Sequence, residues 1–371
     1  MLMITLVFLA LYALLIGYYL YHWIRLPQVE QFEGVAPVFV SVVIAARNEE
    51  TRLPHLMQSL LKQDYPSSLF EVIVVNDYST DKTAEVFNEN KNAHFHIIQP
   101  NVPPALSSKK AAIATGVQHA KGELIVVTDA DCVVPATWLS SIVGWQQKTG
   151  ARFIAAPVRF HYKERLVEIF QALDFMVLQG ITAASVASHF HSMANGANLS
   201  YTKDAYLQVN GFEGIDKVAS GDDMLLMYKI WKQYPKHVIY LKSRSAIVVT
   251  DPMPSWRAFL QQRQRWASKT LYYDDKKVLG VAAFVYLFNV WAIVLLAMSF
   301  FDAAYWWLLI TFVLLKMIIE LPFVAAVARF YGMQRLLIYF LLFQPLHILY
   351  TVSVGIMSQL GAYNWKGRIV K

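Results

Sequence analysis

The chain has 371 residues, a single cysteine and a formal net charge of +7, from 33 basic and 26 acidic side chains. Only 16% of its residues are charged and 56% are hydrophobic, whereas a soluble domain carries about 25% and about 45–50%. This composition excludes a disordered chain and an ordinary soluble protein. The lone Cys132 excludes an internal disulfide framework and favours a reducing compartment.

The first strongly apolar block is residues 3–24, which carry no acid or base except His22. This length suits a helix that crosses a membrane, which needs about 20 apolar residues. A cleaved signal peptide would begin with basic residues, but here the start is uncharged and an aromatic belt follows at Tyr18, Tyr19, Tyr21 and Trp23. We therefore expect residues 1–25 to form a retained N-terminal transmembrane helix.

Residues 37–275 form a domain-sized block in which strand-like and helix-like segments alternate. Short apolar runs predict strands at 39–46, 71–77, 94–98 and 123–129, and helical patterns fall between them at 48–62, 79–89, 108–120 and 135–148. This alternation predicts an α/β domain with a mostly parallel sheet. In such sheets ligands bind beyond the carboxyl ends of the strands.

Polar side chains follow three of these predicted strands. Arg47, Asn48 and Glu49 follow the first, and Asp77 ends the second. Asn48 and Ser79 could equally cap the next helix, whereas capping does not explain Asp77. Asp129 and Asp131 follow the fourth strand, where two carboxylates can hold a divalent cation, although an Asp-rich turn is the alternative.

Two later segments of this block have open interpretations. Residues 165–185 have helical apolar spacing, which fits either core packing or contact with the membrane or an acceptor. Residues 256–272 are basic and aromatic just before an apolar block, which predicts an interfacial helix at the membrane surface.

The last block, residues 278–371, is apolar again and ends in a basic tail. It contains segments at 278–300, 303–328 and 336–360, the second interrupted by Lys316, Glu320 and Pro322 and the third broken near Pro345. Arg25, Lys276 and Lys277 flank the middle block, which places that block on the cytoplasmic side by the positive-inside rule. The third segment is either re-entrant or a full span that puts the basic tail outside.

Several common nucleotide-binding and metal-binding patterns are absent from the sequence. No G-x-G-x-x-G follows the first strand and no phosphate-loop motif occurs, which disfavours a dinucleotide dehydrogenase and a P-loop enzyme. The basic residues form no dense run or nucleic-acid motif, so we expect no nucleic-acid partner.

The motifs taken in order resemble the family 2 glycosyltransferases, which have a GT-A fold, a Rossmann-like mixed sheet. The resemblance rests on five motifs over about 40–270: Ala46–Glu49, Asn76–Asp81, Asp129–Asp131, Gly221–Asp223 and Gln262–Trp266. The last, Q-x-x-R-W, resembles the membrane-embedded branch, which includes cellulose, chitin, hyaluronan and poly-N-acetylglucosamine synthases and ceramide glucosyltransferases. Lys109 and Lys110 stand where many relatives have a Gly-Lys pair, with Ser108 in place of the glycine.

The resemblance implies a role for each matching residue. Asp77 would contact the base, with Arg47 and Glu49 nearby, and Asp129 would face the sugar diphosphate. Asp131 would hold a divalent cation, Mg or Mn. Asp223 rather than Asp222, by its place in the motif, would be the catalytic base on the acceptor hydroxyl. The donor-binding residues on the last motif would be Gln262, Arg265 and Trp266.

The implied function is an inverting hexosyltransferase that uses a nucleotide-sugar, with a UDP-linked sugar favoured. A lipid acceptor is favoured over a growing polysaccharide coupled to export, because three C-terminal segments make a thin bundle for a channel. We expect an integral protein of a bacterial inner or plasma membrane with a cytoplasmic catalytic domain. The alternative from another class is a transporter or receptor with a nucleotide-binding domain, in which Lys316 and Glu320 would line a pathway.

Overall fold

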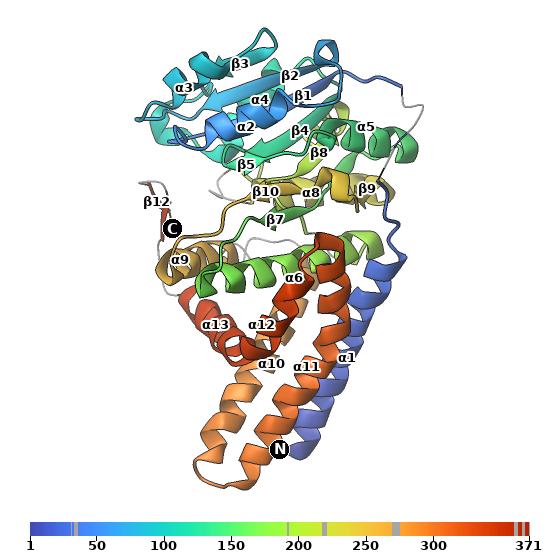
Figure 1. Ribbon diagram of the computed structural model, residues 1–371, viewed down its shortest axis with the longest axis vertical. Helices are drawn as coiled ribbons and strands as arrows, with labels where there is room; N and C mark the ends of the chain where they lie inside the picture. The colour runs from blue at the N-terminus through green and yellow to red at the C-terminus, as the bar shows by residue number, and fades with distance from the viewer. Residues whose placement is uncertain are drawn as a thin grey trace. The chain divides into compact units, whose positions relative to one another are not determined.

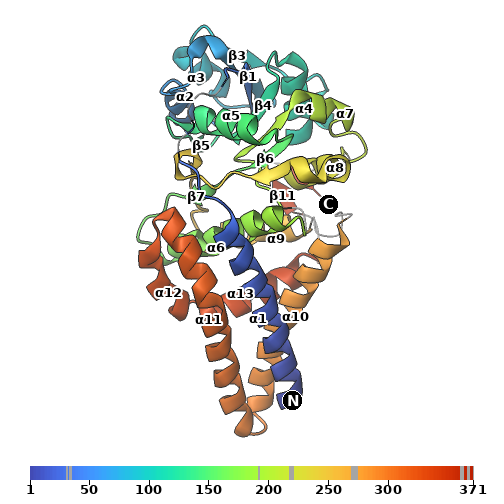
Figure 2. The same ribbon diagram turned by 90° about the vertical axis from the view of Figure 1, so that its right-hand side faces the viewer.

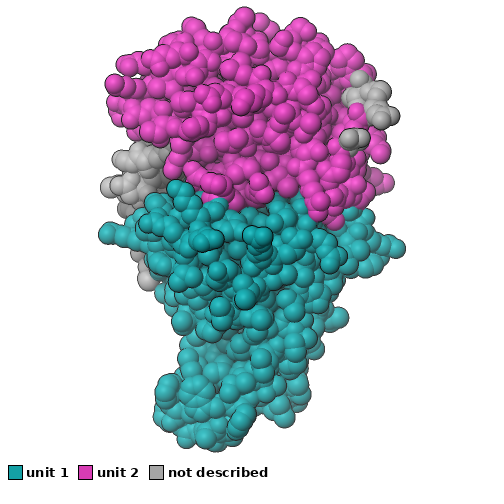
Figure 3. Space-filling view, viewed as in Figure 1, with its two compact units in different colours: residues 1–26, 162–191, 252–371 teal, residues 27–161, 192–251 magenta. Residues whose placement is uncertain are grey.

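The computed structural model describes residues 1–30, 32, 36–190, 193–216, 221–268, 275–359, 363–365 and 368–370. Lys366 and Lys371 of the predicted basic tail lie outside these residues. The chain divides into two compact units, coloured separately in Figure 3. The sheet unit comprises residues 27–161 and 192–251, and the helical unit comprises residues 1–26, 162–191 and 252–371.

The sheet unit is built on a seven-stranded sheet in the order β3-β2-β1-β4-β8-β6-β9. Its strands are β1 (Val40–Ala46), β2 (Phe70–Asn76), β3 (Phe95–Ile98), β4 (Leu124–Asp129), β6 (Phe153–Ala155), β8 (Leu199–Thr202) and β9 (Val238–Tyr240). A smaller sheet has the order β5-β10-β7, from β5 (Cys132–Val133), β7 (Val158–Phe160) and β10 (Val248–Thr250).

The four strands predicted from apolar runs are confirmed, and they pair in parallel. β1 lies between β2 and β4, and its buried side chains, such as Val42 and Val43, are wholly shielded from solvent. The other half of the sheet departs from the predicted parallel pattern, because β8 runs antiparallel to both β4 and β6. The result is the mixed α/β sheet expected for the fold class.

Helices pack beside this sheet, as Figure 1 shows for α2 and α4 near β1 and β2. The helices of the sheet unit are α2 (Leu53–Leu60), α3 (Thr83–Asn90), α4 (Lys109–His119), α5 (Trp138–Thr149), α7 (Lys203–Gln208) and α8 (Asp222–Gln233). Gly116 of α4 shows how close the layers come, since an added Cβ there would lie 2.4 Å from Val43 Cγ1 of β1. The predicted alternation of strands and helices is therefore correct, and α2 and α3 begin four to five residues later than the pattern indicated.

The helical unit contains the apolar blocks from both ends of the chain. Its helices are α1 (Leu2–Arg25), α6 (Leu166–Ser188), α9 (Trp256–Ala267), α10 (Lys276–Ser299), α11 (Ala304–Tyr331), α12 (Leu337–Leu342) and α13 (Gln344–Met357), followed by a two-stranded ladder of β11 (Tyr363–Trp365) and β12 (Arg368–Val370). In Figures 1 and 2, α1 and α11 run side by side and α6 lies across their ends.

Four helices within the described residues are long and apolar enough to cross a membrane: α1, α6, α10 and α11. α6 differs from the others because 83% of its most apolar window is buried, against 22–28% for the other three. This burial favours the packing interpretation of residues 165–185. The sheet unit has other bounds than the predicted 37–275 domain: it begins at residue 27 and lacks residues 162–191 and 252–275. These excluded residues contain α6 and α9, which pack with helices of the terminal blocks.

The third C-terminal segment is broken, as the sequence predicted near Pro345. Residues 334–342 and α13 form a pair bent by 74°, which is either a broken span or a re-entrant loop. Gln344 at the break is buried and accepts a hydrogen bond from Lys316 Nζ at 2.6 Å and donates one to Glu320 Oε2 at 2.9 Å. Lys316 and Glu320 also form an ion pair at 2.7 Å, so these two charges of α11 neutralise each other inside the helical unit.

Candidate active site

The carboxyl ends of β1, β2 and β4 lie side by side, as the parallel register requires. Ala45 pairs with Asp129 and Ala46 pairs with Asn76. The polar residues that follow these strands are therefore neighbours in space although the chain separates them by about 30 to 85 residues. The edge predicted to bind a ligand carries the polar side chains in the structure.

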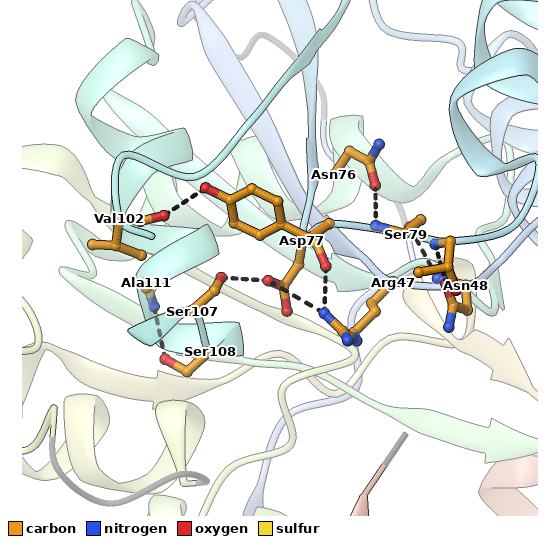
Figure 4. A network of polar contacts seen from close by, with 11 residues as sticks. Arg47, Asn48, Asn76, Asp77, Ser79, Val102, Ser107, Ser108 and Ala111 are labelled. Atoms are coloured by element: carbon orange, nitrogen blue, oxygen red, sulfur yellow. Dashed lines mark hydrogen bonds and ion pairs between the residues drawn. The ribbon is translucent and has the colours of Figure 1, made fainter. Parts of the chain in front are cut away.

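Asp77 stands at the end of β2 and is held from two sides (Figure 4). It is only 2% exposed. Arg47 Nη1 donates a hydrogen bond to the Asp77 carbonyl oxygen at 2.8 Å and lies 4.0 Å from Asp77 Oδ1. Ser107 Oγ donates to the same carboxylate oxygen. Two predicted site residues, Arg47 and Asp77, are thus in direct contact.

The loops after β1 and β2 are locked together by Asn48 and its partners (Figure 4). The Asn48 backbone N–H donates to Ser79 Oγ at 3.0 Å, and the Asn48 Oδ1 accepts from the Thr80 N–H at 2.9 Å. Asn48 and Tyr78 both adopt left-handed backbone angles, with φ of 53° and 52°. The capping interpretations of Asn48 and Ser79 are wrong, because α2 and α3 begin after Arg52 and Lys82. The polar side chains instead fix the two loops to each other.

A lysine and two aspartates form the centre of the site. Lys109, the first residue of α4, has its Nζ 2.6 Å from Asp129 Oδ1 and 3.1 Å from Asp222 Oδ2. Burial lowers the pKa of Lys109, but the neighbouring carboxylates of Asp129 and Asp222 raise it by more, so its pKa lies above its ordinary value. The Ser108 side chain caps the start of α4 by accepting from the Ala111 N–H at 3.2 Å. Residues 107–109 therefore connect the Asp77 side of the site to the Asp129 side.

Asp223 lies at the start of α8, next to Asp222. Its carboxylate accepts hydrogen bonds from the Gly196 N–H at 3.0 Å and from the Met224 N–H at 2.7 Å. The absence of a side chain at Gly196 matters here, since an added Cβ would lie 2.8 Å from Lys109 Nζ and 3.2 Å from Asp222 Oδ2. Both carboxylates of the Gly-Asp-Asp motif thus belong to the cluster around Lys109 and Gly196.

The remaining carboxylates near this edge differ in exposure. The Asp131 side chain is 30% exposed, and its Oδ2 lies 3.9 Å from Arg52 Nη1. Glu49 is 6% exposed, and its backbone N–H donates to Thr83 Oγ1 at 2.8 Å. Among the described residues, no group of three or more His, Cys, Asp or Glu side chains is arranged to hold a metal ion.

Cys132 follows Asp131 and is 1% exposed. Its Sγ lies 3.9 Å from Asp131 Oδ1. Burial, and then the charges of Asp131 and Asp129, raise the pKa of the Cys132 thiol well above its ordinary value. The thiol is therefore held in its unreactive protonated form.

The three predicted residues of the last motif lie on α9 in the helical unit. Gln262 has a buried Oε1 with no hydrogen-bond partner within the described residues, and Trp266 packs with its ring centre 6.2 Å from that of Phe175. Asp77, Asp129, Asp131 and Asp223 belong to the sheet unit, so the predicted site residues are divided between the two units. Within the sheet unit, Arg47 and Asp77 are in direct contact, and Asp129 and Asp223 both belong to the cluster around Lys109 and Gly196. Glu49 and Asp131 lie on the loops that follow β1 and β4.

Two residues of the site were not assigned a role by sequence reasoning. Ser107 carries no signal in the sequence, because its bond to Asp77 depends on where the loop before α4 lies. Lys109 carried a weak signal, its position in a Lys-Lys pair at the start of a predicted helix. A basic residue at a helix N-terminus is unfavourable for the helix dipole, and this unfavourable placement is the clue that it has another partner.

Comparison with known proteins places the chain among glycosyltransferases. The family model "Glycosyl transferase family group 2" matches residues 124–356, and "Glycosyl transferase family 2" matches residues 41–192. The probable glycosyltransferase YdaM of Bacillus subtilis is 25% identical over 246 residues, 63% of this chain and 55% of that protein. The beta-monoglucosyldiacylglycerol synthase of Nostoc is 31% identical over 125 residues, 33% of this chain and 26% of that protein. The chain thus aligns with little more than half of the first of these relatives and about a quarter of the second.

A solved structure has the same fold. The mannosyltransferase PcManGT from Pyrobaculum calidifontis, in complex with GDP-Man and Mn²⁺, matches with a TM-score of 0.57 and 18% identity, and the match covers 96% of this chain and 97% of that one. At this identity the likeness concerns the fold alone. The α/β class predicted from the sequence is therefore confirmed as the GT-A fold.

Proposed function

We propose that this chain, which belongs to glycosyl transferase family group 2, transfers a sugar from a nucleotide-sugar donor to a lipid acceptor at a membrane. The observation that carries the proposal is the connected set of contacts at the sheet edge. It runs from Arg47 and Asp77 through residues 107–109 to Asp129 and Asp222. Its polar groups could bind a nucleobase, a diphosphate and an acceptor hydroxyl, and they lie at the place where α/β sheets bind ligands.

In this proposal, the Asp77 end of the set binds the nucleoside. A buried carboxylate held by Arg47 and Ser107 is a fixed acceptor for a base amide or a ribose hydroxyl. Glu49 lies on the same loop as Arg47 and is 6% exposed. The resemblance favours uracil as the base, whereas the complex of PcManGT contains GDP-Man, so a donor screen must include both.

The diphosphate and the cation would lie near Asp129 and Asp131. The residues fit a divalent cation, because the two carboxylates stand one residue apart at a strand end and are about one-third exposed, and Mg²⁺ or Mn²⁺ commonly takes its remaining oxygens from substrate phosphates and water. Such a cation would neutralise charge on the departing diphosphate. On α9, Arg265 would grip phosphate oxygens, with Gln262 and Trp266 beside it.

Asp223 would act as the base on the acceptor hydroxyl. Its carboxylate is oriented by two backbone N–H groups, which fix its position. An ionised carboxylate can accept the hydroxyl proton as the oxygen attacks the sugar carbon from the face opposite the diphosphate. The outcome is inversion at that carbon.

Three features favour a lipid acceptor at a membrane. Within the described residues, α1, α10 and α11 are long and apolar enough to cross a bilayer and are at most 28% buried over their most apolar windows, and the motif-bearing α9 precedes α10 in the chain. The Nostoc relative is named as a synthase of a diacylglycerol glycolipid. We infer an integral membrane protein, with the sheet unit on the cytoplasmic side as the basic flanks Arg25, Lys276 and Lys277 indicate.

The alternatives make different predictions. A polysaccharide synthase, which the Q-x-x-R-W motif favours, would yield a ladder of long products. A transporter would need Lys316 and Glu320 to face a pathway, whereas they pair with each other at 2.7 Å and are at most 10% exposed. This pairing disfavours the transporter.

The test is a donor screen on the full chain in membranes, with UDP- and GDP-sugars and with or without a chelator. Release of nucleoside diphosphate and a single labelled lipid product are expected, and both should require a divalent cation. Asp223→Asn should reduce turnover about 1000-fold while the donor still binds. The exposed carboxylate variant Asp204→Asn is the matched control. Unchanged transfer by Asp223→Asn would remove that residue from its role, and a ladder of long products would refute the lipid acceptor.

A further inference from the structure

The Q-x-x-R-W segment contains a second arginine, Arg263, at a position that the motif leaves unspecified. Arg263 is 3% exposed, which makes it the most buried residue of the segment. Its Nη2 lies 2.7 Å from Asp174 Oδ2 of α6, and the Asp174 side chain is 8% exposed. A buried pair between two helices of the same unit therefore lies inside the motif that is proposed to bind the donor.

The guanidinium of Arg263 also stacks on aromatic rings of its own helix. Its Cζ lies 4.2 Å from the ring centre of Trp266 and 5.1 Å from that of Phe259. These residues are spaced at i, i+4 and i+7, so they share one face of α9. Trp266, a proposed substrate-binding residue, is thus held through Arg263 on one side and packs near Phe175 of α6.

A second polar contact joins α6 to the segment that precedes α9, about one helical turn before Asp174 on α6. Gln171 is fully buried, and its amide forms two hydrogen bonds with the backbone of Met253, one to the carbonyl oxygen at 2.9 Å and one from the N–H at 2.8 Å. Phe170, next to Gln171, packs on Trp256 and Phe259, with ring centres 5.4 and 5.7 Å apart. These two aromatic residues lie between Met253 and Arg263 in the chain. One face of α6 therefore fixes both the segment that leads into α9 and the middle of α9.

A further group faces the pair from α13. His347 Nε2 lies 3.9 Å from Asp174 Oδ1, and Gln264 of α9 donates to the Met357 carbonyl oxygen of α13 at 2.9 Å. A buried ion pair is a poor way to gain stability compared with apolar packing, and its best-attested use is to specify one arrangement of helices. This makes the Asp174–Arg263 pair a determinant of where α9 lies.

We propose that Arg263 is a positioning residue: through its ion pair with Asp174 and its stacking on Trp266, it fixes the rotation of α9 and thereby the direction of Gln262, Arg265 and Trp266. The inference rests on the proposed function for the roles of those three residues. Arg263 itself does not touch the substrate. A misplacement of binding groups by about 1 Å can cost about 100-fold in rate, so the pair has a large effect at a distance.

The test is a double-mutant cycle in the full chain, with Asp174→Asn, Arg263→Gln and the combined variant. Each single variant leaves one buried charge unpaired and should lower kcat about 100-fold, whereas the combined variant should recover to within about tenfold of the parent. Arg257→Gln, on an exposed position of the same helix, is the control and should lie within twofold of the parent. Arg263→Lys keeps the charge and should give an intermediate loss.

The outcomes separate this inference from the proposed function. If Arg263→Gln stays inactive in the Asp174→Asn background, Arg263 acts on the substrate directly and the positioning role is refuted. The melting temperatures of the same variants are also measured on purified protein in detergent. The falls in melting temperature caused by the two single substitutions should not add in the combined variant. If the parent transfers no sugar at all, the proposed function fails. Melting shifts that add would independently refute the coupling between Asp174 and Arg263.

Discussion

Replacing Lys109 with methionine tests the centre of the site, because it removes the cation that lies between Asp129 and Asp222. Its Nζ is 2.6 Å and 3.1 Å from the two carboxylates. Breaking a fully buried ion pair costs about 3–5 kcal/mol, and an exposed pair contributes about 0–1 kcal/mol. The side chains of Lys109, Asp129 and Asp222 are 21%, 35% and 9% exposed, which places this cluster between the two limits.

We therefore expect Lys109→Met to destabilise the sheet unit by about 2 kcal/mol. For a unit of about 200 residues, that corresponds to a fall of about 4–8 °C in melting temperature. The donor diphosphate would also meet two unscreened carboxylates, so the donor KM should rise by up to about 30-fold, the factor that 2 kcal/mol represents. Differential scanning fluorimetry and steady-state kinetics measure the two effects.

The controls separate the charge from the side-chain volume. Lys109→Arg keeps the charge and should retain most of the stability. Lys121→Met removes an exposed lysine from the same unit and should change the free energy of unfolding by less than about 0.5 kcal/mol. If Lys109→Met melts and binds donor as Lys121→Met does, the Lys109–Asp129–Asp222 cluster contributes neither to stability nor to donor binding, and the reasoning is refuted.

Three further predictions concern other parts of the sheet unit. Gly196→Ala should displace the flexible end of Lys109, so the donor KM should rise while the melting temperature changes little. Gly17→Ala, in α1 of the helical unit and with open space around it, is the control, and an unchanged KM of Gly196→Ala would contradict the contact. Asp131→Asn should raise the Mn²⁺ concentration needed for half-maximal transfer, and an unchanged metal titration would remove Asp131 from the cation site. Burial lowers the pKa of Lys242 to about 8, so the folded chain releases its proton before the unfolded chain does. The free energy of unfolding should therefore rise between pH 8 and about pH 10.4, and urea titrations should show no such difference between those pH values in Lys242→Met.

The sequence predicted the parts of the fold that depend on local patterns. The apolar runs predicted β1, β2, β3 and β4, and their order with the intervening helices predicted a parallel arrangement whose carboxyl ends carry Arg47, Asp77 and Asp129. The rule that ligands bind at this edge needed no knowledge of side-chain contacts.

Contacts between distant segments could not be predicted in this way. Lys109 and Asp222 are separated by more than 110 residues, and no periodicity links them. The antiparallel β8 and the short β6 and β9 carry too few residues for a clear alternation. The burial of α6 and the pairing of Asp174 with Arg263 depend on which helices meet, which the apolar composition of each helix leaves open.

The single cysteine has a practical consequence for experiments. Because Cys132 is shielded from solvent and its thiol remains protonated, maleimide reagents should leave the parent chain unlabelled under native conditions. A cysteine introduced at any exposed position would then be the sole attachment point for a fluorophore or spin label. With one such cysteine placed in each unit, distances between the sheet unit and the helical unit can be measured without first building a cysteine-free background.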